Sequence, residues 1–408
     1  MVALKKQSLG VAVILMNEIK YMVGDEHVSR IVHAPYDDVV IDFLADLSDK
    51  LKSDMRSSAY PDVLTFAFWC RRANLNRLKK EFGREECRLG RGTIFHITPS
   101  NVPINFAYSF VFGLLSGNAN IVRLPSKRYR QVDIVCDAVN DLCKTKKYAT
   151  IKRANSFITY PRSDKISAHI SKGCDGRIIW GGDDTVRTIR TLPMKERGVE
   201  LAFADRYSLC VIDQQAIQSM REKELIRLAE RFYNDTYLMD QNACSSPYLV
   251  LWLGKKDEVA QERFWSAVYA IVAKKYDLEA ISSIDKYTRF CQAAALLDSV
   301  VSLKRMGNFV YRVGLKQLPE DLQLYKENSG YFYEYAPKNL AGISHIISDK
   351  YQTLTYFGID KNMLLDFVVD NMLSGIDRIV PIGQALDIGV MWDGYDVVRT
   401  LSRIVEVR

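Results

Sequence analysis

Strand-like and helix-like segments alternate through the first half of this 408-residue chain, and this alternation constrains the fold more than any other feature. Short apolar runs occupy 92–97, 120–124, 156–160 and 177–180. Each run is followed by a helical pattern, at 105–116, 131–143, 164–172 and 183–191 respectively. Parallel strands need helical crossovers of this kind, which are almost always right-handed. The pattern predicts parallel βαβ units, in which ligands bind beyond the carboxyl ends of the strands.

The remaining segments extend this pattern on both sides. Helical patterns run from 39 to 51 and from Val63 to Phe82, with Gly83 ending the second. Further on we predict strands at 209–212 and 248–253, a helix at 222–237, two long helices to about Leu303, strands within 309–357 and a helix at 360–373. A chain of 408 residues is too long for one ordinary core, so we expect two domains.

Composition narrows the classes of function. The net charge of +7 is modest for this length, so the chain needs no nucleic-acid partner, although it suits a polyanionic cofactor or substrate. We expect no membrane span, because no apolar run is long enough, and we interpret residues 9–16 as a buried strand rather than a signal peptide. Eight cysteines without a CxxC motif predict reduced thiols and a cytoplasmic location. The five histidines are scattered and predict no metal site.

One cysteine stands in a distinctive setting. Asp240-Gln241-Asn242-Ala243-Cys244-Ser245-Ser246-Pro247 is a polar segment between a helical pattern and an apolar strand. A nucleophilic thiol needs partial exposure and an electrostatic field that favours the thiolate. Of the eight cysteines, Cys244 has the best local setting for both, and we predict that it is the nucleophile.

A stiff loop follows the first of the predicted strands. In Ile97-Thr-Pro-Ser-Asn101-Val-Pro103 the two prolines restrict the backbone around one side-chain amide. A rigid amide at the carboxyl end of a strand suits an oxyanion donor. The same pattern also fits an Asn that closes an Asx-type turn.

A cationic cluster follows the next strand. Arg123, Lys127, Arg128 and Arg130 lie within eight residues and surround the hydroxyl of Ser126. Such a cluster can hold a phosphate, although an ordinary solvated basic turn has the same composition.

A short turn, Trp180-Gly181-Gly182-Asp183, joins the last strand of the series to its helix. Backbone amides at a helix start can face a pyrophosphate, and glycine allows close approach. The full glycine fingerprint of dinucleotide sites is absent, and a plain βα turn explains the residues as well.

Together, from about Gly92 to the C-terminus, these segments resemble the aldehyde dehydrogenase superfamily, and in particular its acyl-CoA reductase branch, the LuxC-type fatty-acid reductases. Asp240 to Cys244 resembles the Gly-Gln-x-Cys nucleophile motif, with Asp in place of Gly. The loop 99–103 is similar to the oxyanion-asparagine loop, and 117–126 to the strand and turn that hold the adenosine ribose. Branch-like features are Trp180-Gly181-Gly182, Gln352-Thr353, Arg378-Ile-Val-Pro-Ile-Gly383 and Trp392-Asp-Gly394.

This resemblance implies an α/β fold of the aldehyde dehydrogenase type, with two Rossmann-like three-layer αβα domains and parallel-rich sheets. We expect a cofactor-binding domain at 1–205, to which 376–408 returns, and a catalytic domain at 206–375 that carries Cys244. The implied catalytic groups are Cys244, Asn101 and the backbone N–H of Cys244. The implied cofactor contacts come from Arg123, Ser126, Lys127, Trp180, Gly181, Gly182 and Glu334.

Cofactor preference follows from one departure within the resemblance. NAD-preferring members often have Glu at the position of Lys127, where it bonds the ribose hydroxyls. A lysine would pair with a 2′-phosphate instead, reinforced by Arg123 or Arg128, so we predict NADPH.

Two carboxylates have unsettled roles in this comparison. Hydrolytic members carry a Glu-Leu-Gly-Gly base, which resembles Glu200-Leu-Ala-Phe203, but counting back from Ser208 places Phe203 at the base position. We therefore do not assign Glu200 as a base. Glu334 matches a carboxylate that bonds the nicotinamide ribose, and a cross-strand ion pair explains it equally well.

The resemblance implies NADPH-dependent reduction of an acyl thioester, from acyl-CoA or an acyl-protein, to an aldehyde through an acyl-enzyme on Cys244. Two alternatives stay open: an aldehyde dehydrogenase that works in the oxidative direction, and a non-redox scaffold that carries an acyl group. The resemblance also implies a homo-oligomer and an acyl-protein synthetase partner.

Overall fold

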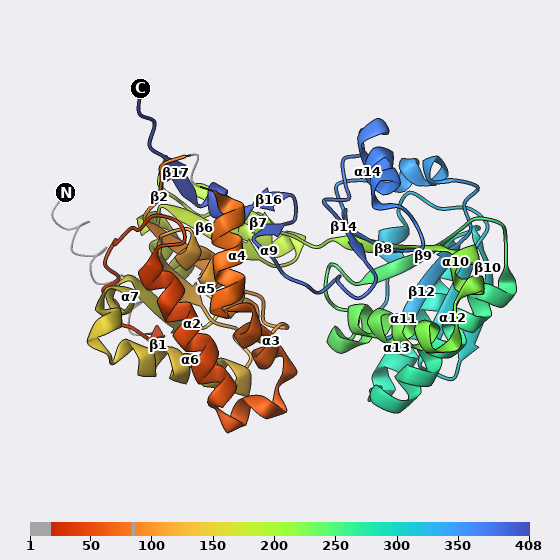
Figure 1. Cartoon of the computed structure of the whole chain (residues 1–408), viewed down its shortest axis with the longest axis horizontal. Coiled ribbons are helices and arrows are strands. Elements are labelled where there is room, and N and C mark those ends of the chain that lie inside the picture. Colours follow the sequence, from red (N-terminus) through yellow and green to blue (C-terminus); the bar gives the residue numbers. More distant parts are fainter. Residues whose placement is uncertain (1–17, 84–85) are drawn as a thin grey trace. The chain divides into compact units, whose positions relative to one another are not determined.

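The computed structural model describes residues 18–83 and 86–408, which form two compact units (Figure 1). The first unit extends to Ala204 and includes Tyr395–Arg408, and the second is Asp205–Gly394. The strand expected at 9–16 lies outside the described residues. Residues 376–394 belong to the second unit rather than the first, because β14 (Arg378–Pro381) pairs in parallel with β13 (Tyr351–Phe357).

The first unit is built on a six-stranded sheet. Its order is β1 (Lys20–Val23), β5 (Asn155–Thr159), β4 (Ala119–Arg123), β3 (Thr93–Ile97), β6 (Gly176–Trp180) and β7 (Val199–Phe203). Only β1 is antiparallel to its neighbour, so the predicted βαβ units are confirmed. The edge strands β1 and β7 complete the sheet and were not predicted.

Helices cover both faces of this sheet. They are α2 (Asp38–Ser53), η1 (Met55–Ala59), α3 (Pro61–Trp69), α4 (Arg72–Phe82), α5 (Asn105–Leu115), α6 (Arg130–Cys143), η2 (Lys146–Tyr148), α7 (Ala149–Ala154), α8 (Asp164–Gly173) and α9 (Asp183–Arg190). Phe95 and Ile97 of β3 belong to one apolar cluster with residues of α8 and α9. His96 between them bonds Ser109 of α5, which therefore covers the opposite face.

The single helix expected from Val63 to Phe82 is two helices. The chain leaves the helical conformation at Arg71 (φ −60°, ψ 144°), and the Asn74 side chain donates to the carbonyl of Trp69. This bond satisfies a carbonyl that the break leaves without its helical partner. The unit also contains β2 (Arg88–Gly90), β16 (Tyr395–Asp396), α15 (Val397–Thr400) and β17 (Ser402–Ile404), of which β2 and β17 pair antiparallel.

The second unit is built on a seven-stranded sheet. Its order is β10 (Val300–Met306), β11 (Val310–Leu315), β12 (Tyr331–Tyr335), β9 (Pro247–Leu253), β8 (Tyr207–Asp213), β13 and β14, and only β10 is antiparallel to its neighbour. The helix expected to reach Leu303 ends earlier. Residues 300–306 form an edge strand instead, because Gly307, at φ 56°, turns the chain into a hairpin with β11.

Helices also sandwich the second sheet. They are α10 (Gln214–Ser219), α11 (Glu222–Thr236), η3 (Tyr237–Met239), α12 (Glu258–Lys275), α13 (Ala280–Leu296), η4 (Leu322–Tyr325), η5 (Leu340–Ile346) and α14 (Lys361–Asp370), and β15 (Met391–Trp392) follows. Phe232 and Trp265 of α11 and α12 pack on Val250 on one face, while Ala293 of α13 and Leu364 of α14 belong to the cluster on the other. Two α/β units with parallel-rich sheets are therefore confirmed. None of the described helices has the length and apolar character needed to cross a bilayer.

Candidate active site

Cys244 lies in a short loop, residues 240–246, which connects η3 to β9 at the amino end of that strand. The loop contains no regular structure beyond turns, so its shape depends on contacts that its side chains make with the rest of the second unit. The cysteine is partly exposed, as predicted, whereas five of the other cysteines are buried.

Gln241 fixes the loop. Its side chain is fully buried and makes four hydrogen bonds to backbone groups. The amide nitrogen donates to the carbonyls of Pro247 (2.9 Å) and Tyr331 (3.1 Å). The amide oxygen accepts from the N–H groups of Gly330 (2.9 Å) and Tyr331 (3.2 Å). Every polar valence of the side chain is used, and the loop is thereby tied to the first residues of β9 and β12.

The backbone at the start of the loop is left-handed. Asp240 has φ 50° and Gln241 has φ 59°. The motif that this segment resembles has glycine at position 240, and glycine adopts this conformation without strain. Asp is one of the few other residues that tolerate it. The hydroxyl of Tyr276 donates to Asp240 Oδ1 at 2.7 Å, so the substituted side chain also has a partner.

Contacts from two other strands hold Cys244 itself. Ser208 Oγ donates to the Cys244 carbonyl at 2.7 Å, and the N–H of Thr353 donates to Ser208 Oγ at 3.1 Å. The backbone N–H of Arg206 bonds the thiol. The carbonyl and sulfur of Cys244 are therefore both tethered within the second unit.

The electrostatic environment of the thiol differs from the prediction. Burial raises the pKa of Cys244 above its usual 9.0, and Asp205 and Asp393 add to the increase. The N–H of Arg206 and the ammonium of Lys326 lower the pKa but do not outweigh burial. Lys326 is itself paired with Asp205 at 2.8 Å, which weakens its field at the sulfur. The prediction that the surroundings of Cys244 favour the thiolate is therefore wrong for this structure, because desolvation dominates.

In the first unit, the strand order defines a site for ligands. Strands β5, β4, β3, β6 and β7 are parallel and follow the order of dinucleotide-binding sheets, with the strand order reversing between β3 and β6. Ligands of such sheets bind at the carboxyl ends of the strands beside this reversal. The loop after β3, which contains Asn101, and the turn after β6, which contains Gly182, both leave the sheet there.

Hydrogen bonds join the loop after β3 to the loop after β4. Thr98 Oγ1 donates to the carbonyl of Arg123 (2.6 Å), and the hydroxyls of Ser100 and Ser126 bond each other (2.8 Å). In the part of the chain that the structure describes, the exposed Asn101 side chain makes no hydrogen bond. Its amide is therefore available to a ligand.

The cationic cluster after β4 is exposed at Lys127, Arg128 and Arg130. Over residues 18–83 and 86–408, neither these three nor Arg123 form an ion pair. The guanidinium of Arg123 lies 4.4 Å from the centre of the Tyr160 ring, and Lys127 lies over Tyr129. Cations without carboxylate partners suit a phosphate, so these residues fit the phosphorylated ribose of a dinucleotide.

The turn after β6 has fewer groups available to a cofactor phosphate than expected. Trp180 is buried, donates through Nε1 to Ser109 Oγ (3.0 Å) and stacks on Phe203 at 4.0 Å. The N–H of Gly181 donates to the carbonyl of Phe203 (3.1 Å). Only Gly182 is open, since an added Cβ there would meet no atom within 4 Å. The first turn of α9 carries Asp183 and Asp184, which disfavour an anion at this helix start.

Glu200 has a structural role. Its carboxylate accepts from Arg177 Nε (2.9 Å) and Arg190 Nε (2.8 Å), and Arg177 is almost fully buried. Phe203, which counting back from Ser208 places at the base position, packs against Trp180. Neither residue provides a carboxylate that could activate water.

Glu334 is likewise occupied. The indole N–H groups of Trp252 (2.8 Å) and Trp265 (2.6 Å) donate to Oε1, and Arg312 donates to Oε2 (2.8 Å). Arg312 lies on the adjacent strand β11, so the cross-strand ion pair is present. Both carboxylate oxygens of Glu334 are thus engaged within the protein, and we do not propose it as a cofactor ligand.

The sequence analysis did not identify the residues that support the cysteine loop from other parts of the chain. Ser208 and the segment 327–330 hold the loop, yet both are distant from Cys244 in sequence. The only local signal is the Ser329-Gly330 pair, which indicates a turn. Among the described residues, no cluster of three His, Cys, Asp or Glu could hold a metal.

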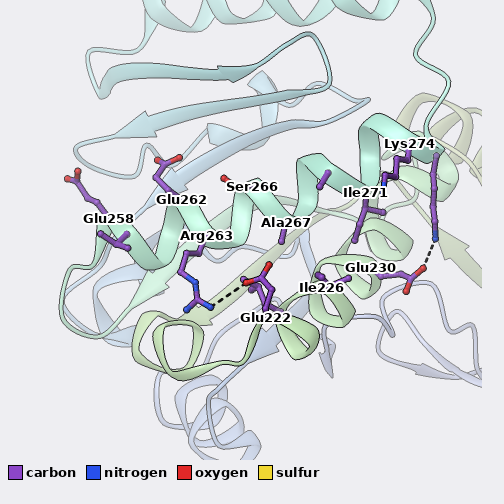
Figure 2. Close-up of a pocket in the computed structure, with 14 residues that line it drawn as sticks. Glu222, Ile226, Glu230, Glu258, Glu262, Arg263, Ser266, Ala267, Ile271 and Lys274 are labelled. Carbon is purple, nitrogen blue, oxygen red and sulfur yellow. Dashed lines mark hydrogen bonds and ion pairs between the residues drawn. The ribbon is translucent and has the colours of Figure 1, made fainter.

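A groove of about 820 Å³ lies between α11 and α12 (Figure 2). Its lining combines apolar residues such as Ile226 and Ile271 with Glu222, Glu262 and Lys274. None of the predicted site residues lines it, so it is separate from the chemistry proposed for Cys244.

Comparisons with known proteins agree with this geometry. The family described as acyl-CoA reductase (LuxC) matches residues 36–308, more than half of the chain, and the match includes Asn101 and Cys244. No curated protein sequence matches.

Solved structures share the fold at low identity. A 1-pyrroline-5-carboxylate dehydrogenase from Thermus with bound NAD is 12% identical, with a TM-score of 0.63 over 91% of this chain and 81% of the enzyme. Proline utilization A from Bradyrhizobium japonicum is 14% identical, with a TM-score of 0.62 over 91% of this chain and 42% of that protein. A protein of Burkholderia cenocepacia assigned as an aldehyde dehydrogenase is 14% identical, with a TM-score of 0.56 over 85% and 77%. The fold of both units is therefore that of the aldehyde dehydrogenase superfamily.

Proposed function

Because the chain belongs to the acyl-CoA reductase (LuxC) family, we propose that it reduces an acyl thioester to an aldehyde with NADPH and that Cys244 carries the acyl group. Membership implies reduction of acyl thioesters to aldehydes. The role of Cys244 is supported above all by the loop that presents it, which Gln241 ties to two strands through four hydrogen bonds.

In the proposed reaction the Cys244 sulfur, after losing its proton, attacks the acyl carbonyl carbon. The C–S bond to the donor breaks, and CoA or the carrier leaves as its thiol. The bound dinucleotide supplies the hydride that reduces the resulting thioester. The thiohemiacetal then expels the Cys244 thiolate and releases the aldehyde. The backbone N–H of Cys244 and the Asn101 amide are the proposed oxyanion donors, each worth about 3 kcal/mol.

The residues at the two candidate base positions, Glu200 and Phe203, favour reduction over hydrolysis. Glu200 is held by Arg177 and Arg190, and Phe203 is apolar. Water attack on the acyl-enzyme would release the acid before the hydride arrives. With both candidate base positions unable to activate water, the thioester is preserved for reduction.

NADPH is proposed because the cluster after β4 has unpaired positive charge. Lys127 stands where NAD-preferring relatives often have Glu, and Ser126 and Arg128 flank it. The Thermus relative binds NAD, so the superfamily fold alone does not set the preference. Lys127→Glu should raise the KM for NADPH and lower that for NADH, and an unchanged ratio would contradict the assignment.

Cys244→Ala tests the central proposal, with Cys291→Ala as the control because Cys291 is also accessible. The Cys244 variant should neither form an acyl adduct, measured by intact mass after incubation with acyl-CoA, nor oxidise NADPH. It should still bind NADPH, and the Cys291 variant should behave as the parent. Normal turnover by Cys244→Ala would refute the role of the sulfur.

The direction of the reaction is tested separately. Incubation with NADP⁺ and an aldehyde, with and without CoA, measures oxidation. Faster oxidation than reduction at matched concentrations would favour the oxidative alternative. The absence of NADPH binding would favour an acyl-carrying scaffold. We also propose that an acyl-protein synthetase supplies the acyl group and that the chain forms a homo-oligomer, which co-purification and light scattering can test.

A further inference from the structure

Lys286 is a buried cation that the proposed chemistry does not use. It lies on α13 of the second unit and is fully buried. Within the described residues it forms no ion pair. Burial lowers the pKa of Lys286 to about 8, and Glu327 opposes this change. A buried ammonium without a carboxylate is costly, so its remaining partners must offset the loss of water.

Those partners are two backbone carbonyls and one aromatic ring. Lys286 Nζ donates to the carbonyl of Asn308 at 2.5 Å and to that of Ser329 at 2.6 Å. The ammonium also lies 5.1 Å from the centre of the Tyr311 ring. Lys286 therefore joins the turn between β10 and β11 to the segment 327–330, which precedes β12.

The segment 327–330 in turn contacts the cysteine loop at three points. The N–H of Ser329 donates to the carbonyl of Asp240 at 3.1 Å, and the N–H of Gly330 donates to Gln241 Oε1 at 2.9 Å. Asn328 Nδ2 donates to Asn242 Oδ1 at 2.7 Å. Ser329 is left-handed (φ 60°), a conformation that costs free energy for a residue other than glycine, so this segment needs external anchors to keep its shape.

We propose that Lys286 is a positioning residue for Cys244, acting by holding the segment 327–330 against the loop 240–246. This inference rests on the proposed function of Cys244. The cysteine carbonyl is fixed by Ser208 on one side, and the segment fixes the loop on the other. Loss of the Lys286 bonds weakens the support of the second side only.

Lys286→Met tests the proposal, because methionine keeps the side-chain volume and removes the donors. Asn328→Ala breaks the surface contact between the segment and the loop while leaving Lys286 in place. Each variant should speed the alkylation of Cys244 by iodoacetamide, because a loosened loop relieves the burial that raises the pKa of the thiol. Each should also lower kcat by about tenfold, with the KM for NADPH unchanged. The double variant should alkylate no faster and turn over no more slowly than Lys286→Met alone, because both changes act through one contact path.

Val268→Ala is the matched control. Val268 is a fully buried residue of α12, and its apolar cluster is separate from the one that contains Ala293 of α13, the helix of Lys286. This variant should lower the Tm and leave alkylation and kcat close to those of the parent. If Lys286→Met does the same, or if its effect multiplies with that of Asn328→Ala, the proposal is overturned. Lys286→Gln, whose shorter side chain cannot reach both carbonyls, replaces Lys286→Met if that variant does not fold, and a faster alkylation of Cys244 is again expected.

Alkylation separates this inference from the proposed function. If Cys244→Ala reduces acyl-CoA normally, the proposed function fails, yet the alkylation rates still report whether Lys286 sets the environment of the thiol. If Cys244 is essential and Lys286→Met alkylates at the parent rate, the positioning role fails alone.

Discussion

Replacement of Gln241 by Ala should loosen the cysteine loop by an amount that the structure allows one to work out. The variant removes four hydrogen bonds of 2.9, 3.1, 2.9 and 3.2 Å to backbone groups of Pro247, Gly330 and Tyr331. At about 1 kcal/mol for each bond, the loss is about 4 kcal/mol. Since about 1.4 kcal/mol corresponds to a factor of ten, local opening should become about a thousandfold more frequent.

Hydrogen exchange measured by mass spectrometry is the appropriate assay, because the amides of Gly330 and Tyr331 are direct partners of Gln241. Peptides that cover 240–248 and 327–333 should exchange faster in Gln241→Ala, and kcat should fall with them. Gln214→Ala is the matched control. Gln214 is an equally buried glutamine that donates to the carbonyl of Leu253 at the opposite end of β9.

The control variant should speed exchange near Leu253 and leave 327–333 unchanged. An increase of less than about tenfold at Gly330 and Tyr331 in Gln241→Ala would show that other contacts hold the loop, and the calculation above would be wrong.

Three further predictions concern titration and ion pairing. Because burial holds the pKa of Cys244 above 9.0, its alkylation rate in the ligand-free protein should still be rising as pH passes 9.0, and a plateau near neutral pH would contradict this. Burial raises the pKa of Asp235 from 3.8 to about 7, so the folded state binds more protons than the unfolded state between these values. The free energy of unfolding should therefore fall as pH rises from about 4 to 7, and Asp235→Asn should flatten that slope in urea titrations. Glu200→Ala should cost about 3 kcal/mol of stability, because it leaves the buried Arg177 without its carboxylate, and should not change the ratio of acid to aldehyde formed.

The strands of the first unit were predictable because their signal is local. The apolar runs at 92–97 and 120–124 became β3 and β4 within about a residue, and the glycine and proline residues around them mark the turns. The break at Arg71 was missed because the apolar spacing continues through α3 and α4. The strand β10 was missed because Val300, Val301 and Leu303 suit either a helix or an edge strand, and pairing with β11 decides between them.

The candidate site likewise combines residues that have a local sequence signal with properties that depend on distant parts of the chain. Cys244, Asn101 and Lys127 could be proposed from the sequence because each lies in a recognisable local segment. The pKa of the thiol was not predictable, since it depends on burial and on Arg206 and Lys326, which are far from Cys244 in the chain. The pairing of Glu334 with two indoles and a guanidinium also depends on side chains from three separate elements.

The left-handed backbone at Asp240 also limits which residues can replace it at the start of the cysteine loop. Glycine and asparagine suit φ 50°, and each lies one base change from an aspartate codon. Valine is equally close in the genetic code but would clash with its own backbone there. Natural variation at position 240 should thus be confined to Asp, Asn and Gly. At the neighbouring Gln241, whose polar atoms are all hydrogen-bonded, any substitution should lose at least one of these bonds.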